Sequence, residues 1–262
     1  MKPGDILEDR YTVVRPIAEG GMSTVVEVKD KRLPGRLVAK QMRQSMLGGA
    51  ETGQLEALFR REAEVLSKLS HAFLPKVTDY FESEGRRFLV EELVEGETLE
   101  AWASQRETLR ESRVIGWAIQ ICQALQYLHD HGIVYRDLKP SNVMITPNDD
   151  IRLIDFGLVR FYTLGKAQDT IVMGTPGYAA PEQYGQGQTD PRSDIFSLGA
   201  LMHHLLTGED PSIRPFVFGP VREANANVSE HVDYAVRKAV QTDPQLRFES
   251  AEAMEQALLG QR

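Results

Sequence analysis

The sequence is poor in cysteine, in long apolar runs and in positive charge, and each shortage excludes a class of protein. Cys122 is the only cysteine among 262 residues, which excludes an internal disulfide and a zinc site built from several thiolates. No apolar run approaches the roughly 18–20 residues of a membrane-spanning helix, and the first residues lack the apolar stretch of a signal peptide. The 30 basic and 38 acidic residues give a net charge of −8, which argues against a general nucleic-acid binder. We therefore expect a soluble, cytoplasmic protein with no membrane segment in this chain and no nucleic-acid partner.

The distribution of apolar residues predicts two lobes. Short β-prone segments separated by Gly, Pro and charged residues come first, together with one stretch whose apolar residues recur at helical spacing. From about Glu97, apolar stripes at helical spacing dominate. We expect an α+β fold: a first lobe of antiparallel sheet and one main helix (about 1–90), a hinge (about 91–96) and a mostly helical second lobe (about 97–262). Two lobes joined by a short hinge leave a cleft, where a ligand usually binds.

A carboxylate interrupts the apolar stripe of the helix predicted in the first lobe. Glu62 lies at helical spacing from Leu58 and Phe59, and a carboxylate that faces a core needs a cation. Lys40 ends a β-prone run and is the available partner. Two simpler interpretations stay open: Glu62 can reach solvent at the edge of the stripe, and Lys40 can be a solvated strand residue.

A run of small residues in 17–25 separates two predicted strands. Ala18, Gly20, Gly21 and Ser23 would let backbone amides approach phosphate oxygens. A glycine-rich hairpin turn explains the same residues equally well, so this segment alone does not decide between them.

A more specific group of polar residues lies in 135–142. Asp137, Lys139 and Asn142 follow one short apolar run, and Asp155 ends the next. The oxygens of Asn142 and Asp155 suit a hard cation such as Mg²⁺ bound together with nucleotide phosphates. Asp137 could then orient a hydroxyl nucleophile and accept its proton.

These segments, in this order, resemble the signature set of protein kinases. From about Tyr11 to Leu258 the chain is similar to serine/threonine kinases of the bacterial type. The matching segments are the glycine-rich loop at 18–25, Val38-Ala39-Lys40, Glu62, the catalytic loop at 135–142, Asp155-Phe156-Gly157, Gly174-Thr175, Ala180-Pro181-Glu182, Ser193-Asp194 and Arg247. Ala18 and Ser23 replace family glycines, and Tyr135 replaces a histidine that stacks on the residue equivalent to Phe156. None of these departures removes an atom that the chemistry needs.

The resemblance implies transfer of the γ-phosphoryl group of ATP to Ser or Thr hydroxyls of proteins, with Mg²⁺ or alternatively Mn²⁺ as the metal. The implied reaction residues are Lys40, held by Glu62, on the α and β phosphates, Asn142 and Asp155 on the metal, Asp137 as base, and Lys139 offsetting charge on the transferred group. Lys139 and Thr175 also indicate Ser/Thr rather than Tyr substrates.

The resemblance also implies which residues bind the nucleotide. They are Ile17, Ala18, Glu19, Gly20, Gly21, Met22, Ser23, Thr24, Val25, Ala39, Lys40, Val90, Glu91, Leu93 and Met144. Val25, Ala39 and Met144 would enclose the adenine, with Val90 behind it. The backbone near Glu91 and Leu93 would accept and donate its hydrogen bonds.

Structural and regulatory roles follow from the same resemblance. Asp194 would anchor the backbone of the catalytic loop, and Arg247 would pair with Glu182. Arg136 would hold a phosphorylated activation segment, which spans 155–182. Thr170, and less favourably Thr163, are the candidate phosphosites, and the simpler interpretation that Thr170 is an ordinary loop residue stays open. We expect autophosphorylation through transient self-association.

Two rival functions fit the same motifs less well than protein phosphorylation does. A pseudokinase would bind nucleotide without turnover, but the reaction residues are all present. A small-molecule phosphotransferase of similar fold would generally lack the peptide-docking segment found here at 174–182.

Overall fold

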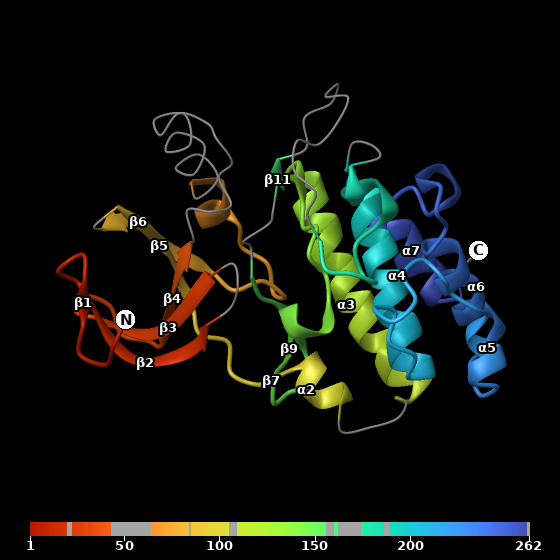
Figure 1. Cartoon of the computed structure of the whole chain (residues 1–262), viewed down its shortest axis with the longest axis horizontal. Helices are drawn as coiled ribbons and strands as arrows, with labels where there is room; N and C mark the ends of the chain where they lie inside the picture. Colours follow the sequence, from red (N-terminus) through yellow and green to blue (C-terminus); the bar gives the residue numbers. More distant parts are fainter. Residues whose placement is uncertain are drawn as a thin grey trace. The chain divides into compact units, whose positions relative to one another are not determined.

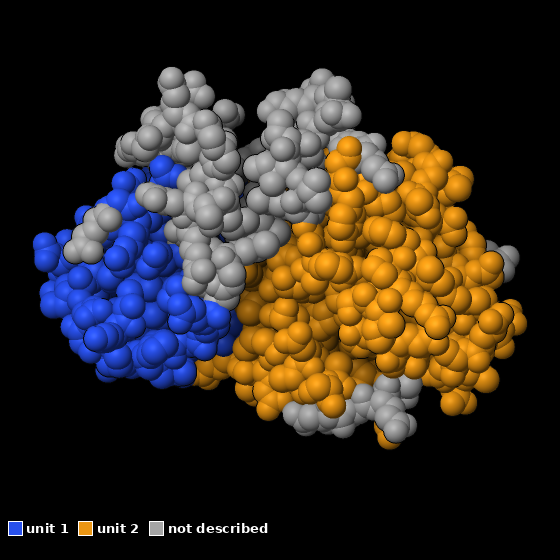
Figure 2. Space-filling model, viewed as in Figure 1, with its two compact units in different colours: residues 1–94 blue, residues 95–262 orange. Residues whose placement is uncertain are grey.

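The computed structural model describes residues 1–19, 23–42, 64–83, 85–104, 109–155, 160–161, 174–185 and 189–260. The chain forms two compact units, Met1–Val94 and Glu95–Arg262 (Figure 2). Their boundary falls within the segment 91–96 that the sequence predicts as a hinge. The first unit is built on an antiparallel sheet and the second mainly on helices (Figure 1). The predicted α+β class is therefore confirmed.

The sheet of the first unit has the strand order β1-β2-β3-β4-β6-β5, with neighbouring strands antiparallel (Figure 1). Its strands are β1 (Ile6–Leu7), β2 (Tyr11–Glu19), β3 (Ser23–Asp30), β4 (Leu37–Met42), β5 (Val77–Ser83) and β6 (Arg86–Glu92). The turn between β5 and β6 includes Gly85 at a φ of 70°, a conformation that glycine adopts without steric cost. Residues 64–68 are helical.

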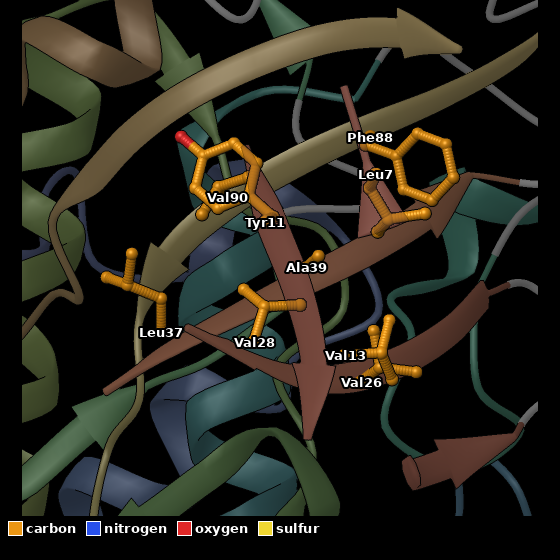
Figure 3. Close-up of a cluster of buried hydrophobic side chains, with 9 residues drawn as sticks. All are labelled: Leu7, Tyr11, Val13, Val26, Val28, Leu37, Ala39, Phe88 and Val90. Atoms are coloured by element: carbon orange, nitrogen blue, oxygen red, sulfur yellow. The ribbon is translucent and has the colours of Figure 1, made fainter. Parts of the chain in front are cut away.

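The two faces of this sheet carry different residues, because side chains alternate along a strand. One face buries a hydrophobic cluster, drawn in Figure 3: Leu7, Tyr11, Val13, Val26, Val28, Leu37, Ala39, Phe88 and Val90. The register pairs Val25 with Lys40 and Val38 with Glu91. Paired residues share a face, so these side chains lie on the face opposite the cluster.

The second unit consists mainly of helices that pack on one another (Figure 1). They are α2 (Leu99–Ala103), α3 (Glu111–Asp130), α4 (Pro191–Thr207), α5 (Val221–Ala224), α6 (Glu230–Ala239) and α7 (Ala251–Leu258), with the short 3₁₀ turns η2 (Pro140–Asn142), η3 (Pro181–Tyr184) and η4 (Pro244–Leu246). Helix α4 begins after Asp190, whose side chain caps the Arg192 amide, and ends at Gly208 with a φ of 77°. Both ends follow the usual capping rules. None of the helices in the described ranges combines the length and hydrophobicity that crossing a bilayer requires.

Short strands flank the loops of the second unit that carry the predicted site residues. They are β7 (Glu97–Thr98), β8 (Ile133–Val134), β9 (Val143–Ile145), β10 (Ile151–Leu153) and β11 (Arg160–Phe161). One small sheet has the order β10-β9-β7, and β11 pairs with β8. The loop 135–142 therefore starts at one strand and ends at another, and Asp155 comes two residues after β10. The strands fix both ends of the segments that carry the predicted chemistry.

Candidate active site

Three polar side chains, two from the loop 135–142 and one from Thr175, surround the carboxylate of Asp137. The Thr175 hydroxyl donates to Asp137 Oδ1 at 2.9 Å, and Lys139 Nζ lies 2.9 Å from Asp137 Oδ2 and 2.9 Å from Thr175 Oγ1. Asn142 Nδ2 donates to both Oδ2 and the main-chain carbonyl of Asp137, each at 2.8 Å. Asp137 and Asn142 are 7% and 6% exposed. The residues that sequence analysis assigned to catalysis in this loop are thus in mutual contact.

The chemistry available at Asp137 follows from these contacts. Its carboxylate already accepts a hydrogen bond from an aliphatic hydroxyl, that of Thr175, the same chemical group that a Ser or Thr substrate presents. Lys139 places a positive charge beside the same oxygens. A carboxylate within hydrogen-bond reach of a hydroxyl can orient it and accept its proton.

The backbone of this loop is held by a fully buried carboxylate on α4. Asp194 Oδ2 accepts from the Tyr135 amide at 2.8 Å, and Oδ1 accepts from the Arg136 amide at 2.7 Å. His129 Nε2 lies 2.8 Å from Oδ2. Arg136 has a φ of 69°, which is strained for a residue with a side chain, and these bonds keep it in place. The anchoring contact expected of Asp194 is present.

The segment before Asp155 is tied to the same loop. The Tyr135 hydroxyl donates to the Ile154 carbonyl at 2.5 Å, and the Ile154 amide donates to the Asn142 carbonyl at 2.9 Å. Asp155 itself has a φ of 76°. The expected stacking of Tyr135 on Phe156 lies outside the described residues, but the hydroxyl provides a link that sequence analysis did not foresee.

The donor set at Asn142 and Asp155 fits a magnesium ion that is shared with a nucleotide. The amide nitrogen of Asn142 is engaged by Asp137, which reserves the amide oxygen for another partner. One amide oxygen and one carboxylate are hard ligands of the kind that Mg²⁺ prefers, and Mg²⁺ commonly completes its shell with phosphate and water. Within the described ranges, no three His, Cys, Asp or Glu side chains gather to hold a metal alone.

A second buried carboxylate ties the end of the predicted activation segment to the rest of the second unit. Glu182, on η3, forms a bidentate pair with Arg247, at 2.7 Å from Nη1 to Oε1 and 2.9 Å from Nη2 to Oε2. The Ser193 hydroxyl donates to the same carboxylate at 2.6 Å. The pairing expected of Glu182 and Arg247 is present, and bidentate geometry makes it one of the stronger kinds of ion pair.

In the first unit, Lys40 pairs with a residue that the sequence did not suggest. Its Nζ lies 2.7 Å from Glu91 Oε1, and the two side chains are 8% and 2% exposed. The predicted partner, Glu62, lies outside the described residues. Lys40 and Glu91 share a sheet face because Val38, two residues before Lys40, is directly paired with Glu91.

A comparison with protein families agrees with this geometry. The model of the protein kinase domain matches residues 11–259. The chain belongs to the protein kinase family. Its relatives include a probable serine/threonine-protein kinase of Streptomyces coelicolor, 33% identical over 95% of this chain and 39% of that protein. They also include the kinase PknL of Mycobacterium tuberculosis, at 38% over 79% of this chain and 51% of the relative, and PknB of Mycolicibacterium smegmatis, at 33% over 97% and 43%. The kinase domain thus spans between about two fifths and one half of the length of these relatives.

Two residues predicted to contact the adenine lie on the opposite sheet face from Lys40 in this kinase domain. Ala39 and Val90 belong to the buried cluster (Figure 3). The strand register places this cluster on the face opposite Lys40. The side chains that share a face with Lys40 at these places are Val38 and Glu91, each displaced by one residue from the prediction. A shift of one residue along a strand moves a side chain to the other face. The alternation around Lys40 could have placed Ala39, but Val90 also depends on the register between β4 and β6.

The remaining predicted nucleotide-binding residues are placed as follows. Ile17, Ala18 and Glu19 are exposed near the end of β2, Val25 and Thr24 are half-buried on β3, and Met144 is half-buried on β9. The Leu93 amide donates to the Arg36 carbonyl at 3.0 Å, so this donor is already engaged. Gly20, Gly21, Met22, Thr163, Thr170 and the side chain of Ser23 lie outside what the structure describes.

A cavity of about 610 Å³ in the second unit adjoins the catalytic loop. Lys139 and Thr175 line it, together with Glu100, Tyr178 and His204, which sequence analysis did not single out. The Tyr178 hydroxyl lies 2.6 Å from His204 Nδ1. Burial lowers the pKa of His204 and raises that of Tyr178. The Tyr178 and His204 side chains are therefore uncharged at neutral pH.

Proposed function

We propose that this kinase domain transfers the γ-phosphoryl group of ATP to Ser or Thr hydroxyls of proteins. The observation that carries the proposal is the contact of Asp137 with the Thr175 hydroxyl, Lys139 and Asn142. Family membership supports the reaction class, and the names of the bacterial relatives support Ser/Thr specificity.

Each residue of the loop has a distinct task in the proposed reaction. Asp137 orients the substrate hydroxyl and accepts its proton, and Lys139 offsets negative charge on the transferred group. Asn142 and Asp155 would hold Mg²⁺, or alternatively Mn²⁺, which neutralises phosphate charge when bound. Phosphoryl transfer passes through a loose transition state, so positioning and charge stabilisation account for most of the catalysis.

The first unit would contribute the phosphate contact. Lys40 would bind the α and β phosphates, with Glu62 as a further partner of its ammonium group. Val25 lies on the same sheet face as Lys40, which supports its assignment beside the adenine. Val38 takes the place proposed at first for Ala39, because it shares that face.

The contacts of Thr175 support Ser/Thr substrates and a polypeptide rather than a small molecule. Thr175 joins Asp137 to Lys139 and also lines the cavity of about 610 Å³, which is large enough for side chains of a peptide. The same proposal includes autophosphorylation at Thr170, with the phosphate bound by Arg136, which is 6% exposed. It also includes transient self-association and a cytoplasmic location.

The decisive experiment measures transfer from labelled ATP and Mg²⁺ to a generic basic protein. We expect Asp137→Asn to bind ATP almost as wild type does while transfer falls at least about 100-fold, the usual size of a general-base effect. The matched control is Asp130→Asn at the exposed end of α3, which should transfer at the wild-type rate.

Other outcomes identify the rival functions. Nucleotide binding with no transfer by wild type would indicate a pseudokinase, and transfer only to small hydroxyl compounds would indicate a small-molecule phosphotransferase. Turnover by Asp137→Asn above about one hundredth of wild type would contradict the role of Asp137 as base.

A further inference from the structure

The ion pair between Lys40 and Glu91 lies within the first unit, on the sheet face from which Lys40 would bind the nucleotide phosphates. The distance from Nζ to Oε1 is 2.7 Å, and both side chains are more than nine-tenths buried. Val25 and Leu89 are the residues paired with Lys40 on its two neighbouring strands, so apolar side chains flank the pair. Little water screens the two charges in such surroundings, and their attraction is correspondingly strong.

The other buried carboxylate on this face has partners of its own. Glu27 lies 2.8 Å from Arg15 Nε and 2.9 Å from Arg36 Nε, and the Arg36 hydrogen bond is the largest cause of its lowered pKa. Within the described part of the first unit, Glu91 is the carboxylate that pairs with Lys40. An anion that approaches Lys40 meets the charge of Glu91 at the same point.

We propose that the Glu91 carboxylate competes with the nucleotide phosphates for Lys40 and thereby sets the nucleotide affinity of the domain. This inference rests on the proposed function in one respect, that Lys40 receives phosphate oxygens. A polyphosphate that reaches Lys40 must displace Glu91 or share the ammonium with it, and like charges held a few Å apart repel. Glu91 is thus a positioning residue that acts mainly through Lys40 and weakens the binding of ligands that carry phosphates.

The test compares ligands with and without phosphates on the Glu91→Gln variant. Glutamine keeps the size and the backbone of Glu91 and removes its charge. We expect the dissociation constants of Mg·ATP and ADP to fall about tenfold, the order of effect of one unit charge close to a phosphate. The dissociation constant of adenosine, which carries no phosphate, should stay within about twofold of wild type. Isothermal titration calorimetry on the whole chain measures all three.

The chain offers a matched control and a coupling test. Glu8→Gln removes the same charge from an exposed residue of the first unit that has no part in the proposed nucleotide site, and should leave ATP affinity unchanged. In a Lys40→Met background, Glu91→Gln should alter ATP affinity much less than in wild type, because the competition for the ammonium group is gone and only direct repulsion of the phosphates is left. A role in pocket shape alone would change adenosine binding and would persist without Lys40.

A measurement on the wild-type protein keeps the inference testable if Glu91→Gln does not fold. The side-chain carboxyl resonance of Glu91 should shift when ADP binds and stay in place when adenosine binds. Unchanged or weaker ATP binding by Glu91→Gln, an equal change for adenosine, or a Glu91 resonance that ignores ADP would each overturn the competition. Failure of wild type to phosphorylate proteins would refute the proposed function but leave these binding results interpretable.

Discussion

Tyr135 shows at the scale of one residue how the catalytic loop controls its neighbour. Its side chain is fully buried, its amide binds Asp194 and its hydroxyl binds the carbonyl of Ile154, the residue before Asp155. Tyr135 therefore links the α4 carboxylate that anchors the loop, through its amide, to the residue that precedes the proposed metal ligand, through its hydroxyl. A hydroxyl in this position has a positioning role, although it is remote from the reacting atoms.

We expect Tyr135→Phe to reduce both stability and the apparent affinity for Mg²⁺. The substitution keeps the ring but leaves the Ile154 carbonyl without its donor, which costs about 1–3 kcal/mol for a buried polar group. Asp155 is then held less firmly, so the Mg²⁺ concentration at half-maximal rate should rise. Urea unfolding and a magnesium titration of the transfer rate measure the two effects.

The control for this prediction is Tyr234→Phe. Tyr234 is 56% exposed on α6, so loss of its hydroxyl should change neither the free energy of unfolding nor the magnesium dependence. If Tyr135→Phe loses stability but keeps the wild-type magnesium titration, the hydroxyl stabilises the fold and does not position Asp155.

At the scale of elements, Gly199 sets how closely α4 approaches the end of α6. A Cβ at this position would lie 2.7 Å from the Ala239 Cβ and 2.9 Å from Val240 Cγ1. Real Cβ atoms do not approach so closely, so a side chain here would force the two elements apart. This helix also carries Asp194, which anchors the catalytic loop.

We expect Gly199→Ala to lower the free energy of unfolding by about 1 kcal/mol. Overpacking costs about 1–3 kcal/mol, while replacing a helical glycine by alanine returns about 0.5–1 kcal/mol. Gly116→Ala on α3 is the matched comparison, because its Cβ would meet nothing within 4 Å, and it should raise the free energy of unfolding by about 0.5–1 kcal/mol. Denaturant unfolding of both variants gives the comparison; an equal gain from both would show that α4 and α6 move apart freely.

The elements also show which part of the site was readable from sequence. Asp137, Lys139 and Asn142 lie within one short loop, so their spacing along the chain nearly determines that Asp137 meets the other two, and their grouping into one site needed no tertiary information. Glu182 and Arg247 are distant in sequence, and only the family resemblance suggested their pairing.

The sheet face of Lys40 was harder to predict, for a physical reason. Whether Glu91 or Val90 meets Lys40 depends on the register between β4 and β6, and both residues belong to an apolar strand whose pattern allows either face. Ala39 and Val90 were consequently assigned to the wrong face, and the Lys40–Glu91 pair was missed. Strand alternation fixes one face of a strand once a single residue is placed, so Lys40 could have corrected Ala39, whereas Val90 also required the register between β4 and β6.

At the scale of the whole molecule, the predicted two lobes correspond to two compact units with separate hydrophobic cores. The proposed reaction draws on both: Lys40 belongs to the first unit, whereas Asp137, Asn142 and Asp155 belong to the second. No single core mutation can therefore be expected to affect both sets of residues equally. The proposed activity therefore needs both units.

Autophosphorylation is the whole-molecule property that the proposed function most directly predicts. One copy must present Thr170 to Asp137 of another if the reaction occurs between molecules, so the initial rate per molecule should rise in proportion to protein concentration. Mixing wild type with inactive Asp137→Asn protein should place labelled phosphate on the inactive copy. Thr170→Ala in the inactive copy should remove most of that label, and Thr170→Ala in the active enzyme should lower its activity. Thr163→Ala should have much smaller effects in both. Mass spectrometry of the inactive copy locates the labelled residue. A rate per molecule independent of concentration, with no label on the inactive copy, would mean that each molecule phosphorylates itself and needs no partner.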